Sequence, residues 1–344
     1  MATGNSAFNE ANEYREQARY KEAIESYLDA LKLFKQDNDK EAALDCFLSL
    51  GDTFRAKGEY LRARACYQKA ASIAQALGDV TAQADAHLGK GLTLRALGYW
   101  KEAFQFIRKA YDFYQTHVDE EGQAFALWAE AGTWRIKGDV AMALQQFQKA
   151  MKRYEELDNK SGMGYCYCGL GGASRIAQDY TQSAQSYAKA NHIFKGLRDK
   201  FGMAYSFCGL GNARRMVEDY TGAHDFFNRA SLLYQRIGDR VSYAYTVWSI
   251  ATVHKITGDL DTAGTEYTRA EQFFKETRDP RGQIYCMLGY GEIDYLNGNA
   301  KKGESTIRTA LSSAEKYQFG IEKEYARQLL GGFKTGQGFP FNLP

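Results

Sequence analysis

The stretch Cys168–Ala190, CGLGGASRIAQDYTQSAQSYAKA, returns 40 residues later as Cys208–Ala230, CGLGNARRMVEDYTGAHDFFNRA. Both copies begin with Cys-Gly-Leu-Gly, share an Asp-Tyr-Thr core and end on alanine. Repetition at a fixed period of this length is typical of repeat proteins, in which each unit buries its apolar face against the next. We therefore divide the whole chain into 40-residue units.

Four columns of this unit persist along the chain, and no insertion shifts their register. The invariant column is Ala30, Ala70, Ala110, Ala150, Ala190, Ala230, Ala270 and Ala310. A second small column is Ala23, Ala63, Ala103, Ala143, Ser183, Ala223, Ala263 and Gly303. A bulky column is Tyr27, Tyr67, Ile107, Phe147, Tyr187, Phe227, Tyr267 and Ile307. A third small column is Gly51, Gly91, Ala131, Gly171, Gly211, Ala251, Gly291 and Gly331. Small residues facing bulky ones let two helices pack closely.

Each unit is predicted to hold two helices of about 17 residues, because its apolar residues recur every three or four positions. A capping residue precedes each first helix, namely Asp39, Asp79, Asp119, Asn159, Asp199, Asp239 or Asp279. Glycines mark the turn within the unit, namely Gly58, Gly98, Gly138, Gly258 and Gly298. An acidic residue follows that turn and is expected to cap the second helix, namely Glu59, Asp139, Asp179, Asp219 or Asp259.

These residues resemble a known family. Leu170-Gly171, Tyr180, Ser183, Tyr187 and Ala190 stand at the offsets of the tetratricopeptide repeat signature. The longer unit is similar to that of spindle-orientation G-protein-modulator adaptors, kinesin light chains and bacterial aspartate-phosphatase regulators. The resemblance covers residues 5–333. It implies an all-α, right-handed superhelical solenoid of about eight helix pairs with a C-terminal capping helix.

The ends of the chain carry further expectations. We expect a single solenoid domain over residues 1–333, with the capping helix at 320–333. The tail, residues 334–344, has Phe339, Phe341 and Leu343 among Gly and Pro. We expect this tail to be disordered, and the alternative is that it docks on the protein or on a neighbouring molecule. The repeats begin close to Met1, which argues against the N-terminal helical bundle of the bacterial regulators.

Composition excludes several classes of protein. The chain has 3 prolines in 344 residues, which argues against a proline-punctuated all-β fold, and its net charge of +2 argues against a globally basic nucleic-acid binder. No apolar run is long enough for a membrane span. The six cysteines lack metal-type spacing and favour a reduced, cytoplasmic setting. The five histidines have no repeating acid or nucleophile beside them, so we expect no enzyme activity, no cofactor and no metal.

Two columns of the first helices are candidates for binding, because the family resemblance implies that these helices line the inside of the superhelix. One carries a cation in seven successive units, namely Arg15, Arg55, Arg95, Arg135, Arg175, Arg215 and Lys255. The other becomes aromatic from residue 125 onward. The predicted binding residues are Phe125, Trp128, Arg135, Tyr165, Arg175, Tyr205, Arg215, Tyr245, Trp248, Lys255 and Tyr285.

Both columns also have a structural interpretation. An acidic residue often stands four positions after the arginine, as Asp139 follows Arg135, and this spacing allows an ion pair over the turn. The tyrosines could instead pack between adjacent first helices. The sequence leaves these alternatives open.

The binding interpretation predicts a partner protein. Arginine suits carboxylates, and tyrosine offers apolar area with a polar tip, so an acidic segment with apolar anchors fits such a wall. We expect a non-enzymatic scaffold that binds this segment in its concave groove. One alternative is a regulatory sensor of a short peptide or small ligand, and another is a self-assembling structural scaffold. Nucleic acid is not expected as a partner, and homo-oligomerisation stays open.

Overall fold

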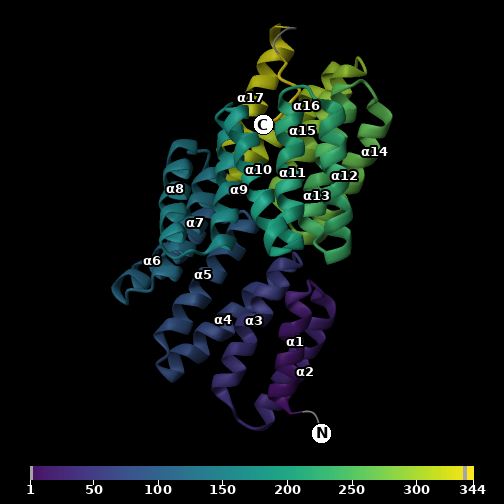
Figure 1. Ribbon diagram of the computed structural model, residues 1–344. Coiled ribbons are helices and arrows are strands. Elements are labelled where there is room, and N and C mark those ends of the chain that lie inside the picture. The colour runs from purple at the N-terminus through teal and green to yellow at the C-terminus, as the bar shows by residue number, and fades with distance from the viewer. Residues whose placement is uncertain (1–2, 336–338) are drawn as a thin grey trace. The chain divides into compact units, whose positions relative to one another are not determined.

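The computed structural model describes residues 3–335 and 339–344 and is built from α-helices joined by short turns (Figure 1). No strand occurs among these residues. The helices are α1 (Gly4–Glu16), α2 (Tyr20–Gln36), α3 (Lys40–Ala56), α4 (Tyr60–Leu77), α5 (Val80–Ala96), α6 (Trp100–Thr116), α7 (Glu120–Lys137), α8 (Val140–Glu156), α9 (Lys160–Ile176), α10 (Tyr180–Leu197), α11 (Lys200–Met216), α12 (Tyr220–Ile237), α13 (Arg240–Ile256), α14 (Leu260–Thr277), α15 (Pro280–Leu296), α16 (Ala300–Tyr317) and α17 (Gly320–Thr335). The predicted all-α repeat fold is confirmed, with odd-numbered first helices and even-numbered second helices.

The bulky column forms the core because glycines clasp it from two helices. Tyr187 on α10 is the example: a Cβ on Gly171 would lie 2.8 Å from its ring, and a Cβ on Gly209 would lie 2.0 Å from it. Gly171 belongs to the first helix of the same unit and Gly209 to that of the next unit. Tyr187 therefore joins two successive repeats, and the two Cys-Gly-Leu-Gly runs that supply Gly171 and Gly209 are packing elements. All eight alanines of the invariant column are fully buried.

Capping follows the predicted pattern with one exception. Six cap residues of the first helices accept a backbone N–H at 2.8 to 3.1 Å, namely Asp39, Asp79, Asp119, Asn159, Asp199 and Asp279. Asp139, Asp179, Asp219 and Asp259 do the same for the second helices at 2.9 to 3.2 Å. Glu59 makes no such bond and instead pairs with Lys57 and Arg62. The longer glutamate side chain reaches neighbouring cations rather than the helix end.

The turn glycines adopt the left-handed conformation expected of them. Gly58, Gly98, Gly138, Gly258 and Gly298 have φ between 79° and 95°. This region costs other residues energy because their Cβ crowds the following carbonyl. In several other turns a residue with a side chain adopts this conformation. Val118, with φ of 56°, is the most strained of these because its side chain is β-branched.

Contacts between residues divide the chain into two compact units, each of which contains several of the 40-residue repeats. The first unit holds residues 1–130 with the short segment 235–240, and the second holds 131–234 and 241–344. In both units consecutive helices pack against each other, and successive first helices also touch, as α3 touches α5, α9 touches α11 and α15 touches α17. In the second unit the turn before α17 reaches the turn before α8, since a Cβ on Gly320 would lie 2.3 Å from the Lys137 carbonyl oxygen. The first and last turns of that unit are thereby in contact.

Candidate functional site

The cations of the repeating column have different surroundings in the two compact units of the chain. In the first unit Arg55 donates to Asp52 Oδ1 at 3.3 Å and to the Tyr67 hydroxyl at 3.4 Å. Arg95 donates to the Ala129 carbonyl oxygen at 2.9 Å and lies 5.7 Å from the ring centre of Trp128, which stacks on Phe125. Phe125 and Trp128 thus lie with Arg95 in the first unit, whereas the other predicted site residues belong to the second unit.

Lys255 is part of the core of the second unit. It forms an ion pair with Glu292, and the two side chains are 2% and 3% exposed. The Tyr325 hydroxyl donates to the other oxygen of Glu292. Burial lowers the pKa of Lys255, while the adjacent Glu292 carboxylate opposes that shift. A buried cation with a buried acidic partner is structural, so Lys255 does not offer its charge to a ligand.

The tyrosine column mostly joins neighbouring first helices. The Tyr165 hydroxyl donates to Asp199 at 2.9 Å, and the Tyr245 hydroxyl donates to Asp279 at 2.8 Å. Each tyrosine thereby holds the carboxylate that caps the next first helix. Tyr285 is buried and its carbonyl oxygen accepts a bond from Trp248 Nε1 at 3.1 Å.

Tyr205 is partly exposed, as are Tyr165 and Tyr245, and its ring lies 6.2 Å from that of the partly exposed Phe201. It therefore offers aromatic surface in the middle of the second unit.

Arg135 and Arg175 each have one buried guanidinium nitrogen without an acceptor in the described part of the chain. Their Nε atoms are buried and have no hydrogen-bond partner among residues 3–335 and 339–344. The predicted ion pairs with Asp139 and Asp179 do not form within this part of the chain, because these carboxylates cap helices α8 and α10 instead. The remainder of each arginine side chain is partly exposed.

Gly172 makes room for Arg135 on the neighbouring helix. A Cβ at Gly172 would lie 2.4 Å from Arg135 Nη1 and 3.1 Å from the Tyr187 hydroxyl. Burial raises the pKa of this tyrosine, and the charges of Arg175 and Arg135 oppose the shift. Both arginines therefore lie close enough to Tyr187 for their charges to lower its pKa.

Arg215, the next residue of the column, is fully buried, and each of its terminal guanidinium nitrogens has a hydrogen-bond acceptor. Its Nη2 donates to Asn212 Oδ1 at 3.1 Å and to the Leu343 carbonyl oxygen at 2.9 Å, and its Nη1 donates to Asn342 Oδ1. Burial lowers the pKa of Arg215 to about 10, and the positive charge of Arg175 is the second cause. Arg215 therefore stays cationic at neutral pH. We call Arg135, Arg175 and Arg215 the arginine surface.

The 339–344 segment ends on this surface. The sequence favoured disorder for the tail, with docking as the alternative. Residues 336–338 lie outside the described part of the chain, and Leu343 is 2% exposed beside Arg215. Its first residue, Phe339, lies 4.0 Å from Tyr295 of α15 and 5.2 Å from Phe333 of α17, measured between ring centres. The segment thus runs from an aromatic cluster on α15 and α17 to Arg215 on α11.

Sequence reasoning missed four residues of this region: Gly172, Asn212, Tyr295 and Asn342. Gly172 and Asn212 occupy one column of the repeat, and that column is variable, so its departures from a consensus were the available signal. Tyr295 and Asn342 had no repeat signal, because their contacts join segments far apart in the chain.

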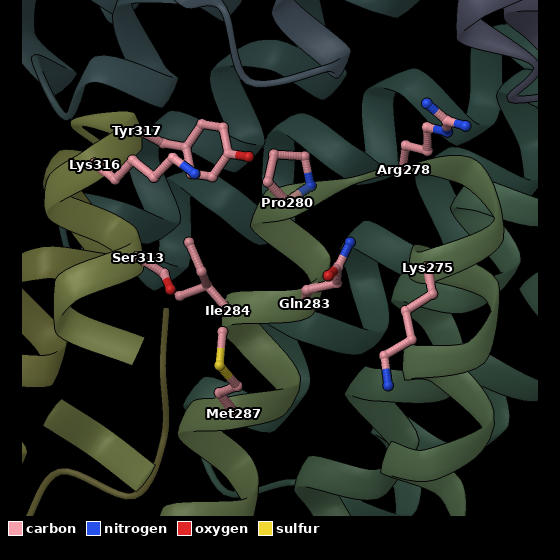
Figure 2. Close-up of a pocket in the computed structure, with 9 residues that line it drawn as sticks. All are labelled: Lys275, Arg278, Pro280, Gln283, Ile284, Met287, Ser313, Lys316 and Tyr317. Atoms are coloured by element: carbon pink, nitrogen blue, oxygen red, sulfur yellow. The ribbon is translucent and has the colours of Figure 1, made fainter. Parts of the chain in front are cut away.

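A separate hollow of about 380 Å³ lies at the ends of α14 and α16 beside α15. Figure 2 shows its residues, among them the cations Lys275, Arg278 and Lys316. Lys275 is paired with Glu271 at 2.9 Å. None of the predicted site residues lines this hollow.

Among residues 3–335 and 339–344, no helix combines the length and the apolar composition that a membrane span needs. The same residues include no group of three or more histidine, cysteine or acidic side chains arranged to hold a metal ion.

Comparison with known proteins places this fold. Two models described as tetratricopeptide repeat match residues 5–37 and 39–116. No curated protein matches the chain.

Solved structures with a similar fold include three Rap-type proteins. The Rap conjugation gene regulator of plasmid pLS20 in complex with the Phr* peptide is 16% identical, with a TM-score of 0.67 over 92% of this chain and 95% of that one. A Rap protein complexed with competence and sporulation factor is 13% identical, with a TM-score of 0.60 over 97% and 98%. Aspartyl phosphate phosphatase F from Bacillus subtilis is 12% identical, with a TM-score of 0.50 over 97% and 95%. Residues 5–37 and 39–116 therefore match tetratricopeptide repeats, and the fold of the chain as a whole resembles that of the two Rap structures.

Proposed function

We propose that this protein is a non-enzymatic scaffold or regulator that binds a peptide segment of a partner protein on the arginine surface. The observation that carries the proposal is the state of Arg135 and Arg175, whose buried Nε atoms have no acceptor among the described residues. Leaving a buried donor unpaired costs about 1 to 3 kcal/mol, and more when the donor is charged. The remainder of each arginine side chain is partly exposed, so a small movement of the guanidinium group would let a ligand supply the missing acceptor and recover that energy.

The chemistry of this surface favours carboxylates and carbonyl oxygens. A guanidinium group donates in a planar fork that matches a carboxylate, and such charge-assisted bonds are stronger than neutral ones. Arg175 also lies close enough to Arg215 to lower its pKa, so a negative charge between them would relieve repulsion. An acidic peptide segment satisfies both conditions.

Apolar anchors of the ligand would contact the aromatic residues beside the arginines. Tyr205 and Phe201 are partly exposed and adjacent, which suits contact with a leucine or phenylalanine of the peptide. The other aromatic residues already pack against or bond to the protein itself, namely Trp248, Tyr245 and Tyr285. In this proposal they stabilise the site and do not contact the ligand.

One similar fold supports a peptide as the ligand. The Rap conjugation gene regulator of plasmid pLS20 was solved in complex with the Phr* peptide, and a second Rap protein was solved with competence and sporulation factor. A shared fold carries this as an analogy, and the unpaired arginines are the evidence from this chain itself.

The test uses fluorescein-labelled peptides that alternate Asp or Glu with Leu or Phe, compared with the same peptides carrying Lys at the acidic positions. Fluorescence anisotropy should show binding of the acidic peptides alone. The double variant Arg135→Gln and Arg175→Gln should weaken that binding by more than about tenfold, because each charge-assisted hydrogen bond contributes about 1.5 to 3 kcal/mol.

The matched control removes two charges elsewhere in the second unit. Arg229 and Arg308 are exposed and pair within their own helices with Asp225 and Glu304. Arg229→Gln with Arg308→Gln should leave binding within about twofold of the wild type, because exposed pairs contribute little. Equal losses in the two double variants would show attraction to net charge alone and would contradict the proposal.

A further inference from the structure

The 339–344 segment contacts the arginine surface through its main chain and through side chains. Arg215 Nη2 donates to the main-chain carbonyl oxygen of Leu343 at 2.9 Å. Asn342 accepts from Arg215 Nη1 through its side-chain oxygen and donates through Nδ2 to the Arg215 carbonyl oxygen at 3.4 Å. The segment therefore satisfies Arg215 with one main-chain carbonyl oxygen, which any peptide would present, and with the side-chain amide of Asn342.

Apolar contacts hold the other end of the segment. Phe339 lies 4.0 Å from Tyr295 and 5.2 Å from Phe333, and Phe341 stacks on Phe339 at 5.2 Å, all measured between ring centres. Leu343 is 2% exposed. A hexapeptide with two aromatic anchors and a buried aliphatic side chain has the features of a bound ligand.

The neighbouring arginines do not share this occupant. The described part of the segment makes hydrogen bonds to Arg215, whereas the Nε atoms of Arg135 and Arg175 have no partner in the described chain. The segment therefore occupies the Arg215 end of the arginine surface, whereas the Nε atoms at the Arg135 and Arg175 end have no acceptor in the described chain.

We propose that the 339–344 segment is an internal ligand that competes with a partner peptide for the Arg215 end of the arginine surface. This inference rests on the proposed function. A partner that spans the whole surface must displace Asn342 and Leu343 from Arg215. The segment therefore raises the concentration of partner that is needed for binding. A displacing peptide would place a carbonyl or carboxylate oxygen at Arg215 and an aliphatic side chain where Leu343 lies.

The expected size of the effect follows from effective concentration. A short tether presents its ligand at about 1 mM. If the free hexapeptide binds with a Kd of about 0.1 mM, the tethered segment weakens binding of a competing peptide by about tenfold.

The experiment uses the full chain and a labelled synthetic hexapeptide of residues 339–344, Phe-Pro-Phe-Asn-Leu-Pro. The release variant carries Phe339→Ser, Phe341→Ser and Leu343→Ser, which remove the apolar contacts of the segment and leave the helices unchanged in sequence. Fluorescence anisotropy should show that the release variant binds the hexapeptide about tenfold more tightly than the wild type.

A peptide-side control avoids any question of folding. The hexapeptide with Asn342→Ala and Leu343→Ser should bind the release variant at least about tenfold more weakly, because it loses the side-chain bonds to Arg215 and the buried aliphatic group. Hydrogen exchange on the wild type should show a protected Leu343 region, and the release variant should lose that protection.

Equal binding of the hexapeptide to wild type and release variant would overturn the inference, as would no binding to either. The acidic peptides of the preceding section separate this failure from that of the proposed function. If they bind in an Arg135- and Arg175-dependent manner but equally to both proteins, the peptide surface stands and the competition is wrong. If they fail while the hexapeptide distinguishes the two proteins, the internal ligand stands and the acidic partner is wrong.

Discussion

Replacing Gly209 by alanine should destabilise the second unit, although alanine is the better helix former. Gly209 lies in α11, where a Cβ would come within 2.0 Å of Tyr187 Cε1 and 2.2 Å of Cδ1. Such distances are impossible, so the ring or the helix must move. The ring has little freedom, because Gly171 confines it from the other side, where a Cβ would lie 2.8 Å from it.

Two opposing effects set the magnitude. Overpacking a rigid core site costs about 1 to 3 kcal/mol. Alanine in place of glycine returns up to about 1 kcal/mol of helix propensity. Since the ring is confined on both sides, we expect the cost to lie at the upper end, with a net loss of about 2 kcal/mol. In a unit of this size such a loss lowers the melting temperature by roughly 5 °C.

The assay is thermal and urea unfolding of the full chain, with Gly264→Ala as the matched control. Gly264 lies in α14, and a Cβ there would meet nothing within 4 Å. This control should gain up to about 1 kcal/mol from helix propensity alone. In a Tyr187→Ala background, Gly209→Ala should cost nothing, because the clashing ring is gone. The packing argument is refuted if Gly209→Ala is as stable as Gly264→Ala, or if its cost survives removal of the ring.

Three further perturbations test other parts of the fold. Lys255→Met should lower stability by about 3 to 5 kcal/mol, because it leaves the buried Glu292 carboxylate unpaired, and a calorimetric scan showing no loss would contradict a structural role for this pair. Val118→Gly should raise the unfolding free energy by about 1 kcal/mol, since Val118 has φ of 56° and is 74% exposed, whereas an unchanged urea midpoint would show that the turn is relaxed. Partial desolvation and the nearby Asp119 carboxylate raise the pKa of Asp85, although the hydrogen bond that it accepts from the Tyr114 hydroxyl at 2.6 Å opposes the shift, so its ionisation costs stability as the pH rises towards neutrality. Asp85→Asn should therefore raise the melting temperature at pH 7 but not at pH 3, and the opposite order would refute the burial argument.

Much of the fold could be predicted from the sequence because the repeat is made of local rules. Columns of alanine, glycine and aromatic residues determine which helix faces meet, and Asp or Asn at fixed positions determines where helices begin. Tyr187 between Gly171 and Gly209 repeats the geometry of Tyr67 between Gly51 and Gly89. Position within the unit was therefore enough to predict these contacts.

The candidate site was less predictable, because residues of one column have different partners. Arg135, Arg175 and Arg215 are equivalent in sequence, yet the first two have unpaired Nε atoms and the third binds Asn342 and Leu343. Lys255 continues the column but is neutralised by Glu292, which lies 37 residues away in the next unit. A repeat pattern specifies the face on which a side chain lies but does not specify which neighbour arrives there.

The amino-acid sequence by itself determined the helix pairs, their caps, their turns and the small-to-bulky packing between them, because each depends on residues within one repeat or its neighbour. Only the tertiary structure decided which arginines keep unpaired guanidinium atoms, where the Tyr165 and Tyr245 hydroxyls bind, and that Leu343 lies against Arg215. Arg215 and Leu343 are 128 residues apart. Contacts at such separation depend on how the stacked units bring distant segments together, and no local pattern encodes that geometry.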